Sequence, residues 1–149
     1  MKQLFKILAL CFFSCEIKMD KVYFITLENN SESRLDFHVA SESSPVIYPD
    51  TILPVNMEDL SLPNITRTVH WSSFTRWEEV INSLPSDTLS IYFFHPDTLS
   101  TYDWSEIRNE YKILKRYDCS IEDLQNLNFK ISYPPTTEMQ TIRQYPPYE

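Results

Sequence analysis

The chain predicts an α+β fold: a single mixed or antiparallel sheet with about three short helices packed on it. Two kinds of segment support this prediction: short β-branched or alternating runs, typical of strands, and segments with apolar residues at helical spacing. The two kinds alternate along the second half of the chain. A β-sandwich with helical insertions has the same order of elements and is the alternative.

Two strands are expected at the start of the folded region. Residues 22–27 form a β-branched and aromatic run, and apolar and polar side chains alternate over residues 34–39. Alternation is typical of a strand with one buried face. The two strands are expected to form an antiparallel hairpin, and the turn residues Asn29-Asn30-Ser31 can reach the left-handed region.

The middle of the chain has little periodicity. Residues 41–63 carry four prolines and are expected to form an irregular connection, with a short extended piece near 46–48. Residues 66–71 are expected to form the next strand, and the apolar run Leu89–Phe94 a central strand buried on both faces. The sequence therefore places the centre of the sheet late in the chain.

Three helices are expected, each starting at a capping box, in which two side chains three residues apart bond each other's backbone N–H groups. The boxes are Thr75 with Glu78, Asp103 with Glu106, and Ser120 with Asp123.

Two further strands and a tail complete the chain. Residues 112–117 fit either a helix end or a strand, and a strand is preferred. Residues 129–133 alternate and are expected to be the closing strand. Residues 134–149 contain four prolines and no apolar period, so a flexible tail is expected after a single domain at 21–133.

The absence of glycine excludes several functional classes. Phosphate-binding loops, dinucleotide fingerprints and the Gly-x-Ser-x-Gly elbow all require it. Tight turns must use other residues, and the related segments at 49–51, 85–88 and 96–98 combine proline with aspartate, serine or threonine. These segments are expected to be turns.

The N-terminus predicts a bacterial lipoprotein signal peptide at residues 1–14. A positive start with Lys2 and Lys6 precedes a seven-residue apolar run, 7–13, which is too short to span a bilayer. Ser14 is a small residue directly before Cys15, so Cys15 is expected to become the acylated N-terminus, followed by a short tether at 15–20. Uncleaved or ordinarily cleaved secretion and a buried cytosolic segment are the alternatives.

The charge of the chain excludes further partners. The formal net charge is −8, and removal of Lys2 and Lys6 with the signal peptide would take it to −10. So acidic a chain repels nucleic acid and anionic lipid head groups. Cys119 would be the only cysteine left beside the acylated one, so no internal disulfide is expected. A buried apolar role is preferred to a nucleophilic one for Cys119.

No metal or cofactor site is expected. The histidines stand about 30 residues apart and never at metal-ligand spacing, and the carboxylates that could gather around calcium already have roles as helix caps or in turns. The residues concerned are His38, His70 and His95, and Asp97, Asp103 and Glu106.

Aromatic residues, 14% of the chain, are the most suggestive remaining feature. Exposed tryptophans would favour stacking on sugars or a protein-binding face. Trp77 and Trp104 fall on the apolar faces of their expected helices, which favours burial in the core. Tyr145 and Tyr148 are the aromatic residues expected outside the core.

Several stretches together resemble a family of small lipoproteins from gut Bacteroidetes. They are 77–91 (Trp-Glu-Glu-Val through Ser-Ile), 111–117, 120–135 and the segment Tyr48-Pro-Asp-Thr51, along with the expected first hairpin. The resemblance implies the cell envelope of a Gram-negative anaerobe. It implies no activity and no functional residues.

Three functions are consistent with these features. The first is a non-catalytic cell-envelope lipoprotein, attached to the outer membrane through Cys15, periplasmic or surface-facing, that binds an envelope protein as an interaction or accessory module. The second is a glycan-binding accessory lipoprotein. The third is a hydrolase, which requires a cleft where His70 or His95 meets acidic residues.

Overall fold

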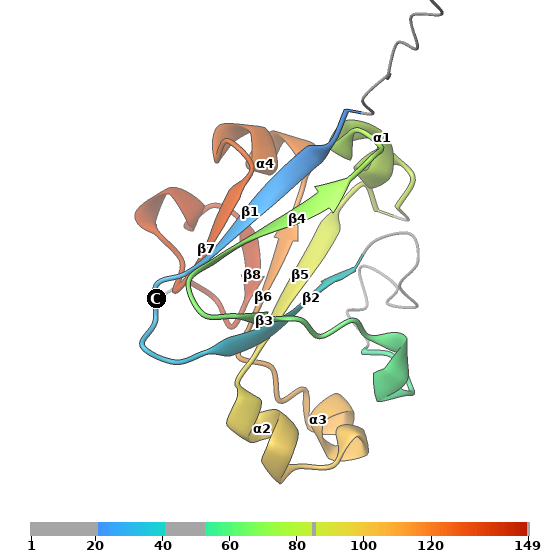
Figure 1. Ribbon diagram of the computed structural model, residues 1–149, viewed down its shortest axis with the longest axis vertical. Helices are drawn as coiled ribbons and strands as arrows, with labels where there is room; N and C mark the ends of the chain where they lie inside the picture. Colours follow the sequence, from blue (N-terminus) through green and yellow to red (C-terminus); the bar gives the residue numbers. More distant parts are fainter. Residues whose placement is uncertain (1–20, 41–52, 85, 149) are drawn as a thin grey trace, which may run out of the picture.

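The computed structural model describes residues 21–40, 53–84 and 86–148 (Figure 1). The expected signal peptide, Cys15, the tether at 15–20 and the extended piece at 46–48 lie outside these ranges. Within them the chain forms four α-helices and eight strands, which confirms the α+β class. No helix in the described part is long and apolar enough to cross a membrane.

The strands form two sheets, so the expectation of a single sheet is wrong. In the three-stranded sheet the order is β4 (Thr68–Ser73), β1 (Tyr23–Asn29) and β7 (Lys130–Tyr133). In the five-stranded sheet the order is β3 (Asn64–Ile65), β2 (Leu35–Ala40), β5 (Leu89–Phe94), β6 (Lys115–Cys119) and β8 (Arg143–Tyr145). β1 and β7 are parallel, and the other neighbours are antiparallel.

The expected hairpin between the first two strands is also wrong, because β1 and β2 belong to different sheets. The Asn29 side chain organises the connection between them: its Oδ1 accepts the N–H of Ser31 (3.0 Å), and its Nδ2 donates to the carbonyl of Ser33 (2.7 Å). None of residues 29–31 has a positive φ. The β-branched run and the alternating pattern therefore each identified a strand but carried no information about its partner.

The two sheets pack face to face around the main core. Ile25 and Leu27 of β1 and Ile131 of β7 meet Phe37 of β2 and Ile91 of β5, all buried. In Figure 1 the three-stranded sheet lies across the five-stranded one. Burial of these side chains is the largest favourable contribution to folding.

A second, smaller core covers the opposite face of the five-stranded sheet. It contains Leu53, Tyr92, Phe94 and Ile107, with Trp104 partly buried beside them. Both faces of β2 are therefore covered, and the expectation that β2 is half exposed is wrong. The central position of β5 is confirmed, since all six of its residues are buried.

The helices lie at the two ends of the sheets (Figure 1). α1 (Trp77–Asn82) and α4 (Ile121–Asn126) lie at one end, whereas α2 (Pro96–Thr101) and α3 (Trp104–Glu110) lie at the other. There are thus four helices where about three were expected. The additional helix is α2, whose first residues were expected to be a turn; proline suits the first position of a helix as well as a turn.

Only one of the three predicted capping boxes is present. Ser120 and Asp123 cap α4 reciprocally, as predicted. α1 begins one residue later than the Thr75 box requires, because the Thr75 N–H binds the Ser73 hydroxyl (3.0 Å) and Arg76 takes the cap position. Asp103 does occupy the cap position of α3, but its side chain makes no capping hydrogen bond.

The ambiguous segment after α3 is a strand, as preferred, although β6 begins only at Lys115. Tyr111 ends α3 in the left-handed conformation (φ 54°), a position that glycine usually takes. Asp87, in one of the predicted turns, has a φ of 48°. The chain thus places larger residues where glycine is normally found.

The prediction of a flexible tail is wrong for residues 134–148. This segment contains a 3-10 turn at Thr137–Met139 and strand β8, which pairs with β6. Met139 and Ile142 are almost completely buried in the main core, at 1% and 4% exposure. The burial of these two side chains stabilises a segment whose four prolines suggested disorder.

Candidate functional site

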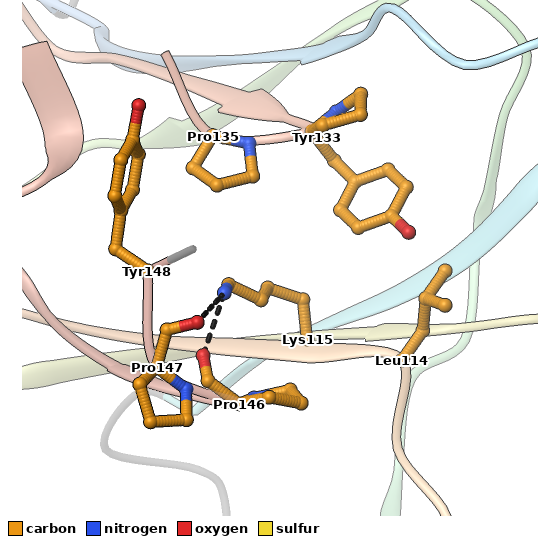
Figure 2. A pocket seen from close by; sticks show the side chains of 8 residues that line it. Leu114, Lys115, Tyr133, Pro135, Pro146, Pro147 and Tyr148 are labelled. Carbon is orange, nitrogen blue, oxygen red and sulfur yellow. Dashed lines mark hydrogen bonds between the residues drawn. The ribbon is translucent and has the colours of Figure 1, made fainter. Parts of the chain in front are cut away.

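A repeated tripeptide lines a groove, which is shown from close by in Figure 2. Tyr133-Pro134-Pro135 begins at the last residue of β7 in the three-stranded sheet, and Tyr145-Pro146-Pro147 begins at the last residue of β8 in the five-stranded sheet. Both Tyr–Pro peptide bonds are cis. We call the hollow between them the Tyr–Pro groove; it has a volume of about 330 Å³ and is lined by Leu114, Lys115, Tyr133, Pro134, Pro135, Pro146, Pro147 and Tyr148.

Lys115 joins the two strands that form one side of the groove. Its Nζ donates to the carbonyl oxygens of Pro146 (2.6 Å) and Pro147 (3.3 Å). Figure 2 shows these two bonds, with the lysine stem lying along the groove. The segment after β8 is therefore held against β6 by a charged donor, which strengthens the bonds to neutral carbonyls.

The two tyrosines that line the groove are held differently. Tyr133 stacks on the buried ring of Phe93, with 5.9 Å between ring centroids, and partial burial raises the pKa of its hydroxyl. Tyr148 lies at the opposite side of the hollow (Figure 2) and is half-buried. Proline rings and a stacked tyrosine lose little conformational freedom when they bind, so the surface is already ordered for contact.

The side chains that line the groove are mainly tyrosine and proline rings. Of the described residues that line it, none is a histidine, a cysteine, a serine or a carboxylate. Tyrosine is one of the residue types enriched at protein interfaces, and the proline rings add rigid apolar surface.

A second polar cluster lies on the outer face of the five-stranded sheet and has a structural explanation. Arg116 and Asp118 form a bidentate pair (Nε to Oδ1 2.9 Å, Nη2 to Oδ2 3.0 Å), and both are buried. Ser90 donates to the same carboxylate (2.8 Å), and the Tyr111 hydroxyl accepts from Arg116. Burial alone would lower the pKa of Arg116, but the bonds to Asp118 outweigh it and raise that pKa.

The histidines are separated from one another, and none meets a carboxylate in a cleft. Buried His38 bonds the carbonyl of Ser61 (3.3 Å), contrary to the expectation that it is solvated, and burial lowers its pKa to about 4. His70 contacts the Thr26 hydroxyl (3.1 Å) on the exposed face of the three-stranded sheet.

His95 has a structural role at the start of α2. Its Nδ1 accepts the Asp97 N–H (3.2 Å) and lies 3.6 Å from the Asp97 carboxylate. The Asp97 side chain is 86% exposed, so this pair lies open to solvent. His95 does not line the Tyr–Pro groove.

The acidic residues proposed for calcium do not come together. In the part of the chain that the structure describes, no group of three or more histidine, cysteine or acidic side chains could hold a metal ion. Glu106 instead pairs with Lys112 (3.3 Å). Cys119 is fully buried in the main core, and burial raises the pKa of its thiol, which opposes a nucleophilic role.

The three tryptophans form no exposed row. Trp77 is buried, as predicted. Trp71 is partly buried with its ring edge-on to Phe37 (5.8 Å), and Trp104 is partly buried and donates Nε1–H to the carbonyl of Pro54 (2.9 Å). This arrangement counts against a tryptophan platform for sugars.

A second hollow of about 530 Å³ lies where the described chain begins. Its lining includes Lys21, Phe24, Arg76, Trp77 and Phe129. The Nε1–H of Trp77 is buried and has no hydrogen-bond partner in the described structure. Arg76 is already paired with Glu78 (3.5 Å), so this hollow carries a less distinct chemical preference than the Tyr–Pro groove.

The sequence reasoning missed the Tyr–Pro groove, although a signal for it was present. Tyr148 was expected outside the core and is one of its lining residues. The repetition of Tyr-Pro-Pro at 133–135 and 145–147 was the feature that could have pointed to a shared site. No family model, curated protein or solved structure matches this chain.

Proposed function

We propose that this protein is a non-catalytic lipoprotein of the cell envelope, anchored to the outer membrane through Cys15, that binds another protein in the Tyr–Pro groove. The observation that carries the proposal is the groove itself. It combines rigid proline rings, two tyrosines and a lysine, and its described lining contains no histidine, cysteine or carboxylate for catalysis.

The position of the groove is consistent with an anchored protein. Cys15 stands six residues before Lys21, so an extended tether spans at most about 20 Å. The chain enters β1 beside Tyr23, whereas Tyr133 pairs with Asn29 at the far end of the same strand. Six residues of strand separate the two ends by about 20 Å, so the Tyr–Pro groove lies at the opposite end of β1 from the point where the described chain begins.

The anchoring part of the proposal is tested by mass spectrometry of the membrane fraction. The expected result is a mature chain that begins at Cys15 and carries acyl groups, and a Cys15→Ser variant that leaves the membrane. An unmodified mature protein in the soluble fraction would disprove anchoring. It would leave the groove open to a separate test.

The binding part is tested by capture from the native envelope with the lipidated protein and its Tyr148→Ala variant. Loss of a discrete partner with Tyr148→Ala, and its retention with Tyr102→Ala, is the expected result. Tyr102 is a matched control because it is also partly exposed, at 39%, but follows α2, outside the groove. Equal recovery with both variants would exclude the groove as the binding site.

The glycan-binding alternative has less support. The tryptophans that could stack on sugars are buried or partly buried, and Trp104 also uses its N–H within the fold. Binding of wild-type protein to a glycan array, lost in Tyr148→Ala, would nevertheless replace the protein partner with a sugar.

A further inference from the structure

The edge strands of the two sheets differ in how they are protected against pairing with other chains. Proteins protect edges with short strands, charged side chains or prolines. Three of the four edges have such protection. β3 has two residues and follows Pro63, β7 has four residues with Lys130 and precedes Pro134, and β8 has three residues with Arg143 and precedes Pro146.

The fourth edge, β4, has none of these features. Its six residues, Thr-Val-His-Trp-Ser-Ser, include no proline, lysine, arginine or carboxylate. Thr68, Val69 and Trp71 are β-branched or aromatic, and Phe74 directly after the strand is 76% exposed. A six-residue segment of high β-propensity and low charge is the kind that pairs with copies of itself.

The hydrogen-bond pattern shows which backbone groups of β4 face outward. The Asn29 N–H binds the carbonyl of Arg67 (2.6 Å), which makes these two residues a hydrogen-bonded pair in the β1–β4 ladder. Hydrogen-bonded pairs alternate along an antiparallel ladder. Thr68, His70 and Ser72 therefore direct their backbone N–H and C=O groups away from β1, and no hydrogen bond of these groups is found in the described structure.

We propose that β4 pairs antiparallel with β4 of a second copy of this chain, joining the two three-stranded sheets into one of six strands. A two-fold axis places like residues near each other, so an uncharged strand pairs with its copy without repulsion. The same arrangement would bring Lys130 toward Lys130 at β7, and Arg143 toward Arg143 at β8. Of these edge strands, β4 is therefore the one that can pair with its own copy without repulsion between like charges.

The register follows from the faces of the strand. Directly opposed residues in an antiparallel pair lie on the same face of the sheet. With Trp71 on the two-fold axis, Trp71 faces Trp71 of the second copy, His70 pairs with Ser72, and Thr68 pairs with Phe74. The paired tryptophans occupy a non-hydrogen-bonded position, where side chains approach most closely. The exposed ring of Phe74 then packs beside Thr68 of the second copy.

The proposal is tested by sedimentation of the full-length chain, purified from membranes, across a concentration series. The expected result is a reversible monomer–dimer equilibrium. Ser72→Pro removes an outward N–H without touching the β1–β4 ladder, and proline is tolerated in such an edge position. Because the two-fold axis removes two bonds at once, this variant should raise the dimer dissociation constant at least about tenfold.

Ser72→Thr retains the N–H and is the matched control, with dimerisation expected at the wild-type level. Residue-resolved amide exchange supplies the second measurement. The amides of Thr68, His70 and Ser72 should exchange more slowly as concentration rises, whereas those of Val69 and Trp71 are already protected by β1.

A chain that stays monomeric up to about 0.5 mM would overturn the proposal. So would a dimer that Ser72→Pro leaves intact, or one in which the outward amides of β4 gain no protection. Each of these results would leave the edge available to a different partner.

Discussion

The two faces of the five-stranded sheet are both buried, but they are stabilised differently. On the inner face, Phe37, Ile91 and Cys119 pack against the three-stranded sheet with apolar surface. On the outer face, Ser90, Arg116 and Asp118 form a buried network of hydrogen bonds and charge. Removing part of an apolar side chain lowers stability in proportion to the apolar area lost. A buried polar network is stable only while each of its groups has a hydrogen-bond or charge partner.

The buried polar network and the Tyr–Pro groove are expected to have different roles. The outer-face network brings serine, arginine and aspartate together, and His38, on the neighbouring strand β2, bonds the carbonyl of Ser61. The Tyr–Pro groove is lined by two tyrosines, four prolines, a leucine and a lysine that bonds the carbonyls of Pro146 and Pro147. Variants on the sheet faces should therefore change stability, and variants in the groove should change binding.

The largest stability effect is expected on the polar face. Asp118→Asn leaves the buried Arg116 charge without its carboxylate, which should lower the free energy of unfolding by about 3–5 kcal/mol in urea titrations. Arg143→Gln is the control, because Arg143 approaches Asp118 only at 3.9 Å with a 63% exposed side chain. Its effect should stay below about 1 kcal/mol. A larger loss in the control would refute the distinction between these two arginines.

The next largest effect is expected from acid. Burial lowers the pKa of His38 to about 4 from the ordinary value of 6.5, so protonation favours the unfolded chain. The contribution of His38 is fully present above pH 6.5 and is lost as the pH falls toward 4. At 1.36 kcal/mol per pKa unit, the loss reaches about 3 kcal/mol.

The acid effect is measured by denaturant titrations at several pH values between 7 and 4. His38→Gln should flatten the stability profile in this range, and His70→Gln, at the exposed face, should retain the wild-type slope. An unchanged slope in His38→Gln would assign the acid sensitivity to other groups.

The smallest effect is expected on the apolar face. Ile91→Val removes one buried methylene in the centre of β5 and should cost about 1 kcal/mol without a change in pH dependence. Thermal denaturation can resolve this difference. A cost as large as that of Asp118→Asn would mean that the apolar face has no more tolerance than the polar one.

Patterns within a few consecutive residues correctly predicted individual helices and strands. The Ser120 box defined the start of α4, and the apolar run at 89–94 defined a strand buried on both faces. The partners of β1 could not be predicted in the same way. Its neighbours begin at Thr68 and Lys130, and no pattern within residues 22–39 encodes contacts that distant.

The structure of the C-terminal segment, residues 134–148, could not be predicted from the sequence either. Its four prolines suggested disorder, but Met139 and Ile142 fill space in the core, and Lys115 binds the carbonyls of Pro146 and Pro147. These contacts become apparent only when β6 and β7 are in place. For the same reason, the repeated Tyr-Pro-Pro segments could be seen in the sequence, but the groove between them could not.

Site-specific photocrosslinking in living cells can show whether the Tyr–Pro groove binds an envelope protein. A photoreactive phenylalanine analogue replaces Tyr148 in one strain and Tyr102 in the other. A discrete crosslinked protein is expected from position 148 and none from position 102. A partner crosslinked only from position 102, or none from either position, would contradict this expectation.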